Sequence, residues 1–418
     1  MRLAHISLYP PRGEKHVDGS GVVSYTKNLV TSLAAGDQNE QFVLCQRIDG
    51  QEAAYEEDGV AVRRCFDRGN MFVAQLHREL KKINPDVIHI QQELALYGGP
   101  LSAYLLHFLV RRWSSRTVVT LHGVVNPSSI TPAFVRQNNS SLPVPLVQFA
   151  FRRIYTPLAE AANRIIVHED LFKDTLVNGY QIPADKISVI PHGVEDLKTI
   201  DEVQARKKLG IPKNAHAVLF MGYATGYKGI DLLLEGFAEY AHADSRAYLL
   251  IGAGKHPKLA QDTAYLKEYE RLQHKAAALI PAKQYRWAGF IGEHDIAAYY
   301  SAADVSLYPY TIAMSSSGPM SFAMSFQKPF LASDAFQDIL GAFPKVLFDR
   351  TAANLAERLA YFFTHKDEYS DLSQAFKTTR SWTQVSASTS AVYQQLIEPQ
   401  ENYDAAENQK EQENTVIG

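Results

Sequence analysis

The sequence has little cysteine, no long apolar run and almost no net charge, and each shortage excludes a class of protein. Two of the 418 residues are cysteines, Cys45 and Cys65, so there is no disulfide framework and no CxxC pair, as expected for a reducing compartment. The start has no apolar h-region and contains Pro10 and Pro11, so we expect no signal peptide. Residues 101–110 form an apolar run too short to span a bilayer. A net charge of −3 argues against a nucleic-acid-binding protein.

What the sequence does contain is a regular alternation of strand-like and helix-like segments. A chain of this length is too long to fold around a single hydrophobic core. The alternation predicts two α/β domains, each with a mostly parallel sheet and helices on both faces. Expected strands cover residues 3–8, 41–45, 60–63, 87–90, 117–121, 164–167, 187–190, 218–221, 248–251, 285–288, 305–308 and 329–332. Expected helices cover residues 22–35, 71–83, 103–113, 201–209, 231–240, 263–279, 295–302 and 320–326. The boundary falls between Pro191 and Lys213, and two such domains predict a cleft between them.

The segment from residue 303 to 334 reads as strand, loop, helix and strand. Its loop and helix start consist of Ser315, Ser316, Ser317, Gly318, Pro319 and Met320. A loop of small residues that opens a helix leaves backbone N–H groups unpaired, in a region of partial positive charge. At the carboxyl edge of an open α/β sheet, such a loop is where a phosphorylated ligand binds. An ordinary scaffold connection has the same composition, so both interpretations stand.

The order of these segments resembles the GT-B glycosyltransferases, specifically the retaining family 4, over nearly all of residues 1–398. The motifs are Ser20-Gly21-Val22, Thr120-Leu121-His122-Gly123, ISVIPHGV at 187–194, Met221-Gly222 with Lys228-Gly229-Ile230-Asp231, LLIGAG at 249–254, Ala302-Ala303-Asp304-Val305 with Lys328-Pro329, and Trp382. The resemblance implies two Rossmann-like domains whose parallel sheets face a central cleft. Residues 1–192 would form the acceptor side and 193–380 the donor side. Residues 381–398 would cross back as a terminal helix. From its acidic, polar composition we expect 399–418 to be a disordered tail.

The resemblance also implies catalytic roles for two residues. Lys228 would place a cation on the donor diphosphate and stabilise the departing nucleoside diphosphate. Because it stands beside a glycine turn, we expect its side chain to be exposed. His122 ends a strand at the edge where cleft residues gather, and it would contact the donor sugar or orient the acceptor. A satisfied structural histidine is the alternative for His122.

Further residues would bind the donor. Gly21 would let the backbone approach the diphosphate, although a glycine needed only for a turn fits the pattern equally well. Phe290 and Ile291 lie in a loop that holds the nucleotide base through backbone contacts in the family. The alternative is that their side chains only belong to the hydrophobic core. The expected donor-binding set is Gly21, Tyr223, Phe290, Ile291, Ser315, Ser316, Ser317, Gly318, Pro319 and Met320.

The sequence departs from the usual family pattern at three positions. Two glutamates eight positions apart are usual, one near the donor sugar and one on the ribose, but Met314 and Phe322 stand there. Tyr223 replaces the usual arginine after the strand glycine. The serines at 315–317 offer neutral hydroxyls and N–H groups instead, and a subset of the family carries such a loop. HIQQELALYGG at 89–99 is similar to the same subset.

The resemblance therefore implies a retaining glycosyltransferase that moves a hexose from a UDP- or GDP-linked donor to a glycan or glycolipid acceptor. It would need no metal and no cofactor, and many relatives build surface polysaccharide or glycolipid. The alternatives are a non-catalytic GT-B subunit that binds a glycan or partner, and another GT-B activity such as an epimerase. FAFRRIY at 149–155 and HFLVRRW at 107–113 mix aromatics with arginines, which suits either an anionic membrane surface or half-buried helices. We expect a cytoplasmic protein, with peripheral contact at the inner membrane face left open.

Overall fold

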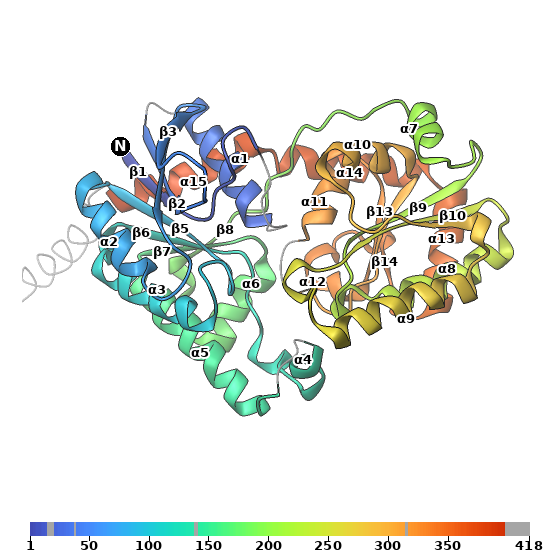
Figure 1. The fold of residues 1–418 in the computed structure, drawn as a ribbon, viewed down its shortest axis with the longest axis horizontal. Helices are drawn as coiled ribbons and strands as arrows, with labels where there is room; N and C mark the ends of the chain where they lie inside the picture. Colours follow the sequence, from blue (N-terminus) through green and yellow to red (C-terminus); the bar gives the residue numbers. More distant parts are fainter. Residues whose placement is uncertain (15–20, 37–38, 138–140, 314–316, 398–418) are drawn as a thin grey trace, which may run out of the picture.

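The chain forms two halves, each built around its own sheet (Figure 1). The computed structural model describes residues 1–14, 21–36, 39–137, 141–313 and 317–397. Met314, Ser315, Ser316 and the tail 399–418 therefore lie outside the described residues. One sheet has eight strands in the order β3-β4-β2-β1-β5-β6-β7-β8, and the other has six in the order β11-β10-β9-β12-β13-β14. Among the described strands only β3 and β4 pair antiparallel, so the predicted α/β fold with two parallel sheets is confirmed.

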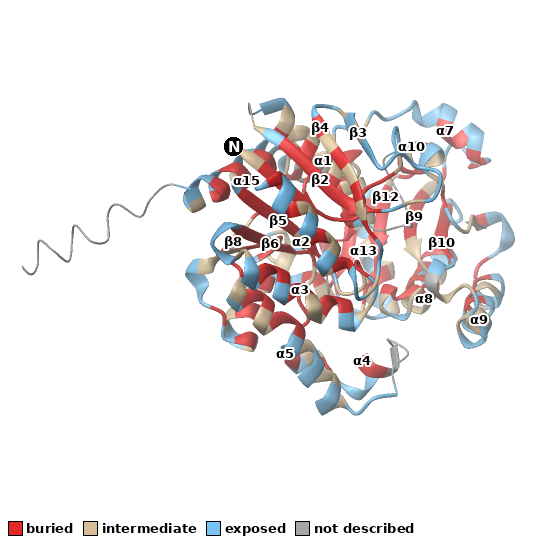
Figure 2. Ribbon diagram, turned by 60° about the vertical axis from the view of Figure 1, so that its left-hand side comes forward, coloured by how far each residue is buried: buried red, intermediate tan, exposed pale blue. Residues whose placement is uncertain are grey.

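Strands of the first half are mostly buried on both faces, although every residue of the edge strand at 54–57 is at least partly exposed. They are β1 (Arg2–Ile6), β2 (Glu40–Gln46), β3 (Ala54–Glu57), β4 (Val60–Phe66), β5 (Val87–Gln92), β6 (Thr117–Leu121), β7 (Arg164–Val167) and β8 (Ile187–Val189). The helices are α1 (Gly21–Gly36), α2 (Phe72–Ile83), α3 (Pro100–Arg112), α4 (Pro132–Gln137), α5 (Val144–Ala161) and α6 (Asp170–Asp174). Successive side chains alternate between faces, so Val118 joins the core under α1 while Val119 joins the core under α2, α3 and α5. Figure 2 shows these strands buried between helix layers.

The second half repeats this construction around a single core. Its strands are β9 (His216–Tyr223), β10 (Ala247–Gly254), β11 (Tyr285–Trp287), β12 (Val305–Tyr308), β13 (Phe330–Ser333) and β14 (Leu347–Phe348). Its helices are α7 (Glu202–Leu209), α8 (Ile230–Ala243), α9 (Thr263–Leu279), α10 (Glu293–Ala302), α11 (Gly318–Ser325), α12 (Gln337–Leu340), α13 (Ala352–Thr364) and α14 (Asp367–Thr379). None of the helices within the described ranges is both long enough and apolar enough to cross a bilayer.

The two halves are joined where the chain crosses between them twice. Val194 donates its N–H to the Arg380 carbonyl at 2.7 Å, and the Arg380 guanidinium pairs with Glu169 of the first half at 2.9 Å. Helix α15 (Trp382–Ile397) then packs against α1. A Cβ on Gly193 would lie 2.4 Å from the Trp382 ring, so only glycine fits this close crossing.

The hairpin of β3 and β4 was absent from the sequence expectations, although its signal is in the chain. Asp58 and Gly59 connect the strands with φ of 52° and 75°. Positive φ at both central residues is the type I′ geometry that Asp-Gly favours in a two-residue hairpin. The strand adds an antiparallel edge to an otherwise parallel sheet, as is common in large α/β sheets.

Candidate functional site

Lys228 lies in the second half where the turn after β9 meets the segment after β12. Its ammonium group donates to the Tyr310 hydroxyl and lies 3.9 Å from the Tyr310 ring centroid and 5.0 Å from that of Tyr227. The residue is only 7% exposed. The expectation of an exposed side chain is therefore wrong.

The backbone of Gly229 explains why Lys228 turns inward. Gly229 has φ of 68°, and a Cβ there would lie 1.8 Å from the carbonyl oxygen of Pro309. The turn is thus pressed directly against the segment that follows β12. The lysine stem therefore enters the protein instead of leaving it, which could not be inferred from Lys-Gly alone.

The Lys228 ammonium has no compensating carboxylate. Its hydrogen-bond partner is a neutral hydroxyl, and within the described part of the chain no acidic side chain pairs with it. Burial lowers the pKa of Lys228 from its ordinary value of 10.5 to about 7. A buried cation that lacks an anion is costly, so this position suits a negatively charged ligand.

The start of α11 adds a second positive feature at the same place. Ser317 caps the helix, because its hydroxyl accepts the Met320 N–H at 3.4 Å, and it also bonds to the Tyr310 hydroxyl at 2.9 Å. The Pro319 carbonyl is held by the hydroxyls of Tyr300 and Tyr308, each at 2.7 Å. The first helical turn is therefore fixed from three sides, with its partial positive charge in place. Its N–H groups are largely used, because Pro319 has none and the Ser321 N–H donates to the Ser317 carbonyl at 2.9 Å.

Gly222 separates the lysine from this helix. A Cβ built on Gly222 would lie 3.8 Å from the Lys228 Nζ and 3.8 Å from the Pro319 side chain. The strand end, the lysine and the helix start thus border one point at the carboxyl edge of the second sheet. Of the predicted donor residues, the structure brings together Lys228, Ser317 and Pro319 here, with Gly318 and Met320 in the same turn.

Tyr223 and Phe290 form a neighbouring aromatic pair. Their rings stack with centroids 6.1 Å apart and planes 12° apart, and the His256 ring lies 5.2 Å from Tyr223. Phe290 is exposed. Ile291 is buried, and its side chain would lie 2.3 Å from a Cβ on Gly252, so it fills the core beneath the sheet edge. A flat aromatic surface of this kind suits a nucleotide base.

His122 belongs to the first half, where both of its ring nitrogens contact other side chains. The Ile190 carbonyl can only accept, so His168 donates to it from Nδ1 at 3.0 Å, and the His168 Nε2 lies 3.1 Å from the His122 Nδ1. The Nε2 of His122 lies 2.8 Å from the side-chain Oε1 of Gln91. Burial holds the pKa of His122 well below its usual value, so the ring is neutral. These contacts favour the structural interpretation, in which His122 positions Gln91, and a direct catalytic role stays a prediction.

Gly21 and Phe322 are the remaining predicted positions. Gly21 is the first residue of α1, and a Cβ there would meet no described atom within 4 Å, which leaves its role a prediction. Phe322 lies on α11 and packs partly buried in the second core, with its ring 6.2 Å from Tyr300. It therefore offers packing at the position where the family usually has a ribose-binding glutamate.

Glu93, for which the sequence predicted no role, follows β5 at the carboxyl edge of the first sheet. Glu93 is exposed, and its charge contributes to raising the pKa of Tyr155 in the first half and of Tyr227 in the second, although burial is the larger cause for both tyrosines. It thus lies within electrostatic reach of both halves. An acid placed directly after a buried strand was the available signal in HIQQEL.

Two family profiles match consecutive parts of the chain. The profile described as Glycosyltransferase Family 4 matches residues 19–196, and Glycosyl transferases group 1 matches residues 201–379. A D-inositol 3-phosphate glycosyltransferase of Acidothermus cellulolyticus is 27% identical over 54% of this chain and 47% of its own length. A mannosylfructose-phosphate synthase of Agrobacterium fabrum is 26% identical over 72% of this chain and 68% of its own. The chain thus spans about half the length of the first of these relatives, 47%.

Solved structures share the fold at low sequence identity. Sucrose-phosphate synthase from Thermosynechococcus elongatus has a TM-score of 0.73 at 18% identity, covering 95% of this chain and 99% of that one. The Anabaena protein HepE, solved in complex with UDP and glucose, has a TM-score of 0.67 at 15% identity, covering 94% and 100%. At these identities the likeness establishes the architecture of two facing Rossmann-like units.

Proposed function

The chain belongs to the group 1 glycosyltransferases of GT-B fold and family 4 type, and from that premise we propose that it transfers a hexose from a nucleotide-activated donor to a glycan or glycolipid acceptor with retention of configuration. The observation that supports this most is the buried Lys228, which lies without a carboxylate beside the start of α11. Both features favour an anion, and a nucleoside diphosphate is the anion that the reaction releases.

The proposed chemistry uses the diphosphate as both leaving group and base. The bond between the anomeric carbon and the diphosphate oxygen breaks, and its electron pair goes to that oxygen. The acceptor hydroxyl bonds to the anomeric carbon from the same face and passes its proton to the departing diphosphate. The Lys228 charge and the partial positive charge at the start of α11 stabilise the negative charge as it develops. No protein nucleophile is required, which suits a sequence with Met314 in place of the glutamate that the family usually has near the donor sugar.

We expect a nucleoside diphosphate to bind mainly to the second half. HepE, which shares the fold, was solved with UDP and with UDP-glucose, and the stacked Tyr223 and Phe290 offer a surface for the base. Calorimetry with UDP, GDP and ADP should show binding of at least one. A ligand bound only by the folded state also raises the melting temperature. If none of the three gives heat or a thermal shift, the glycosyltransferase proposal fails.

One observation favours the alternative of a non-catalytic GT-B subunit. Tyr223 and Phe322 replace an arginine and a glutamate that the family usually has, and both replacements remove charge from the donor site. Hydrolysis of nucleotide sugars without acceptor separates the two functions. Slow release of the nucleoside diphosphate indicates an enzyme, whereas binding without any turnover indicates the subunit.

We expect turnover to need no divalent metal. The sequence has no Asp-x-Asp motif, and Lys228 with the α11 N-terminus supplies positive charge where a metal otherwise neutralises the diphosphate. Excess EDTA should therefore leave the rate of donor hydrolysis unchanged. Loss of activity that magnesium or manganese restores would contradict this part of the proposal.

A further inference from the structure

Three neighbouring helices of the first half expose apolar side chains to solvent. Helix α3 packs between α2 and α5 on one face of the eight-stranded sheet (Figure 1). Twelve large apolar residues are exposed among the described residues, and six of them lie on or directly before these helices. These six are Met71, Leu101, Phe108, Leu142, Leu146 and Phe149, each between 48% and 68% exposed. Isolated exposed apolar residues are ordinary, but a cluster on adjacent helices marks an interaction surface.

Helical spacing places these residues in outward stripes that end in arginines. On α3, Leu101, Leu105, Phe108 and Arg112 follow one another at intervals of four, three and four, so they share one side of the helix. On α5, Leu146 is followed by Phe149 and then by the arginines at 152 and 153. The stripe on α2 likewise runs from Met71 at its start to Lys81 and Lys82 in its last turn.

The charge of this surface is mostly positive. Helices α2, α3 and α5 carry seven basic side chains, which are Arg78, Lys81, Lys82, Arg111, Arg112, Arg152 and Arg153. They carry only two glutamates, and Glu79 is paired with Arg63 and Lys82. The whole chain has a net charge of −3, so this face is a local concentration of positive charge on an otherwise acidic molecule.

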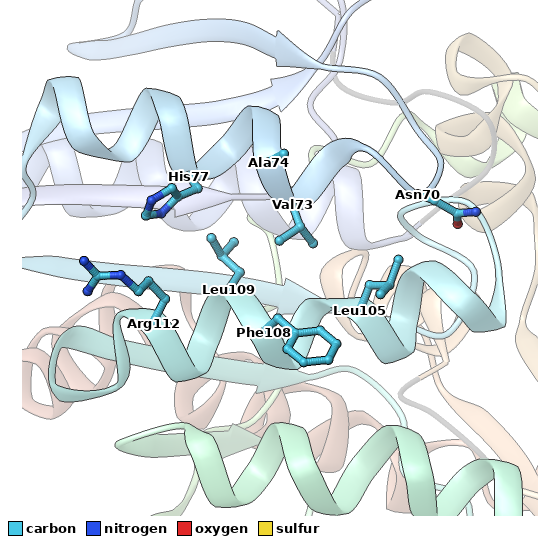
Figure 3. Close-up of a pocket in the computed structure, with 8 residues that line it drawn as sticks. All are labelled: Asn70, Val73, Ala74, His77, Leu105, Phe108, Leu109 and Arg112. Atoms are coloured by element: carbon cyan, nitrogen blue, oxygen red, sulfur yellow. The ribbon is translucent and has the colours of Figure 1, made fainter.

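A groove of about 380 Å³ runs between α2 and α3 within the surface. Val73, Ala74, Leu105, Phe108 and Leu109 line its middle, whereas Asn70 stands at one end and His77 with Arg112 at the other (Figure 3). The Asn70 end belongs to the helix starts, which lie at the carboxyl edge of the sheet and point toward the second half (Figure 3). The apolar part of the surface thus lies nearest the second half, and the basic part lies away from it.

We propose that the surface formed by α2, α3 and α5 docks onto an anionic lipid bilayer. Exposed leucine and phenylalanine side chains enter the boundary between headgroups and acyl chains, while the arginines and lysines meet the lipid phosphates. A second copy of this chain is a poor occupant, because a symmetric contact would bring together two surfaces of the same positive charge. This docking does not depend on glycosyl transfer.

Sedimentation with vesicles tests the proposal on the full chain. We expect binding to vesicles of phosphatidylcholine with phosphatidylglycerol, weaker binding at high salt, and little binding to phosphatidylcholine alone. The double variant R111Q/R112Q should bind the anionic vesicles on the order of thirtyfold more weakly, since each basic side chain near the surface contributes about fivefold. The variant L146S/F149S should lose on the order of tenfold by removing apolar burial.

A matched variant on the second half provides the control. V203S/K207Q removes one exposed apolar and one exposed basic side chain from α7, so it should bind vesicles like the wild type. Melting curves confirm that each variant is folded, and donor hydrolysis in solution should be unchanged in all three. Equal binding by the surface variants and the α7 variant would overturn the proposal. Concentration-dependent dimers that L146S/F149S abolishes, without vesicle binding, would overturn it in favour of self-association.

Discussion

Replacing Lys228 by methionine is expected to lower kcat and kcat/KM together, by roughly ten- to a thousand-fold, as for the loss of one preorganised electrostatic contact. Methionine keeps the length of the aliphatic stem and removes only the charge. The Tyr310 hydroxyl keeps its bond to Ser317 at 2.9 Å, so no buried hydroxyl is left unsatisfied. Steady-state kinetics of donor turnover on both proteins measures the effect.

The same variant should be at least as stable as the wild type. The pKa of Lys228 is about 7 in the folded protein and 10.5 ordinarily, so the unfolded chain holds more protons between these values. Wild-type stability therefore rises with pH across that window, and the full cost of the buried charge is present below about pH 7. Lys228→Met removes the cost, whereas Lys228→Ala leaves a cavity and should destabilise. Urea titrations below neutral pH compare the three proteins. If the methionine variant has the kcat and kcat/KM of the wild type, Lys228 does not contact the donor.

Replacing Gly229 by alanine is expected to damage both the fold and the site. The residue has φ of 68°, and its new Cβ would meet the Pro309 carbonyl oxygen at 1.8 Å. The left-handed conformation and the overlap together should reduce the free energy of unfolding of the second half by about 2–5 kcal/mol. Any relaxation moves the turn that carries Lys228, so nucleotide binding should fall as well. Urea denaturation and calorimetry measure the two effects.

Gly210 provides a matched control for that experiment. It ends α7 with nearly the same φ of 67°, but a Cβ there would meet nothing within 4 Å. Gly210→Ala therefore isolates the conformational cost, which is about 1–2 kcal/mol, and should leave nucleotide binding intact. Similar losses in the two variants would show that the contact with Pro309 does not restrain the turn.

Elements defined by local pattern were predictable from the sequence. The strands at 117–121, 164–167 and 305–308 and the helix at 263–279 have the predicted bounds. Each strand is a short apolar run with turn residues beside it, and the helix begins after Asp262, whose side chain caps its first turn. The order of these elements was also sufficient to identify the two-domain fold.

Features that depend on contacts distant in sequence were not predictable. The burial of Lys228 requires Tyr310 and the Pro309 carbonyl, which stand some eighty residues later in the chain. The hydrogen bonds of His122 require Gln91 on β5 and His168 directly after β7. The charge and exposure along α2, α3 and α5 become one surface only when the sheet places those helices side by side.

Calorimetry of proton uptake measures whether the diphosphate of the donor binds the Lys228 ammonium. At about pH 8 the terminal phosphate of UDP, GDP or ADP is ionised and Lys228 in the free protein is largely neutral, because its pKa is about 7. A bound diphosphate should raise that pKa, so titrations in two buffers of different ionisation enthalpy should show uptake approaching about one proton per bound nucleotide. The Lys228→Met variant should take up none. Nucleotide binding without proton uptake, or the same uptake by the variant, would contradict binding of the diphosphate to Lys228.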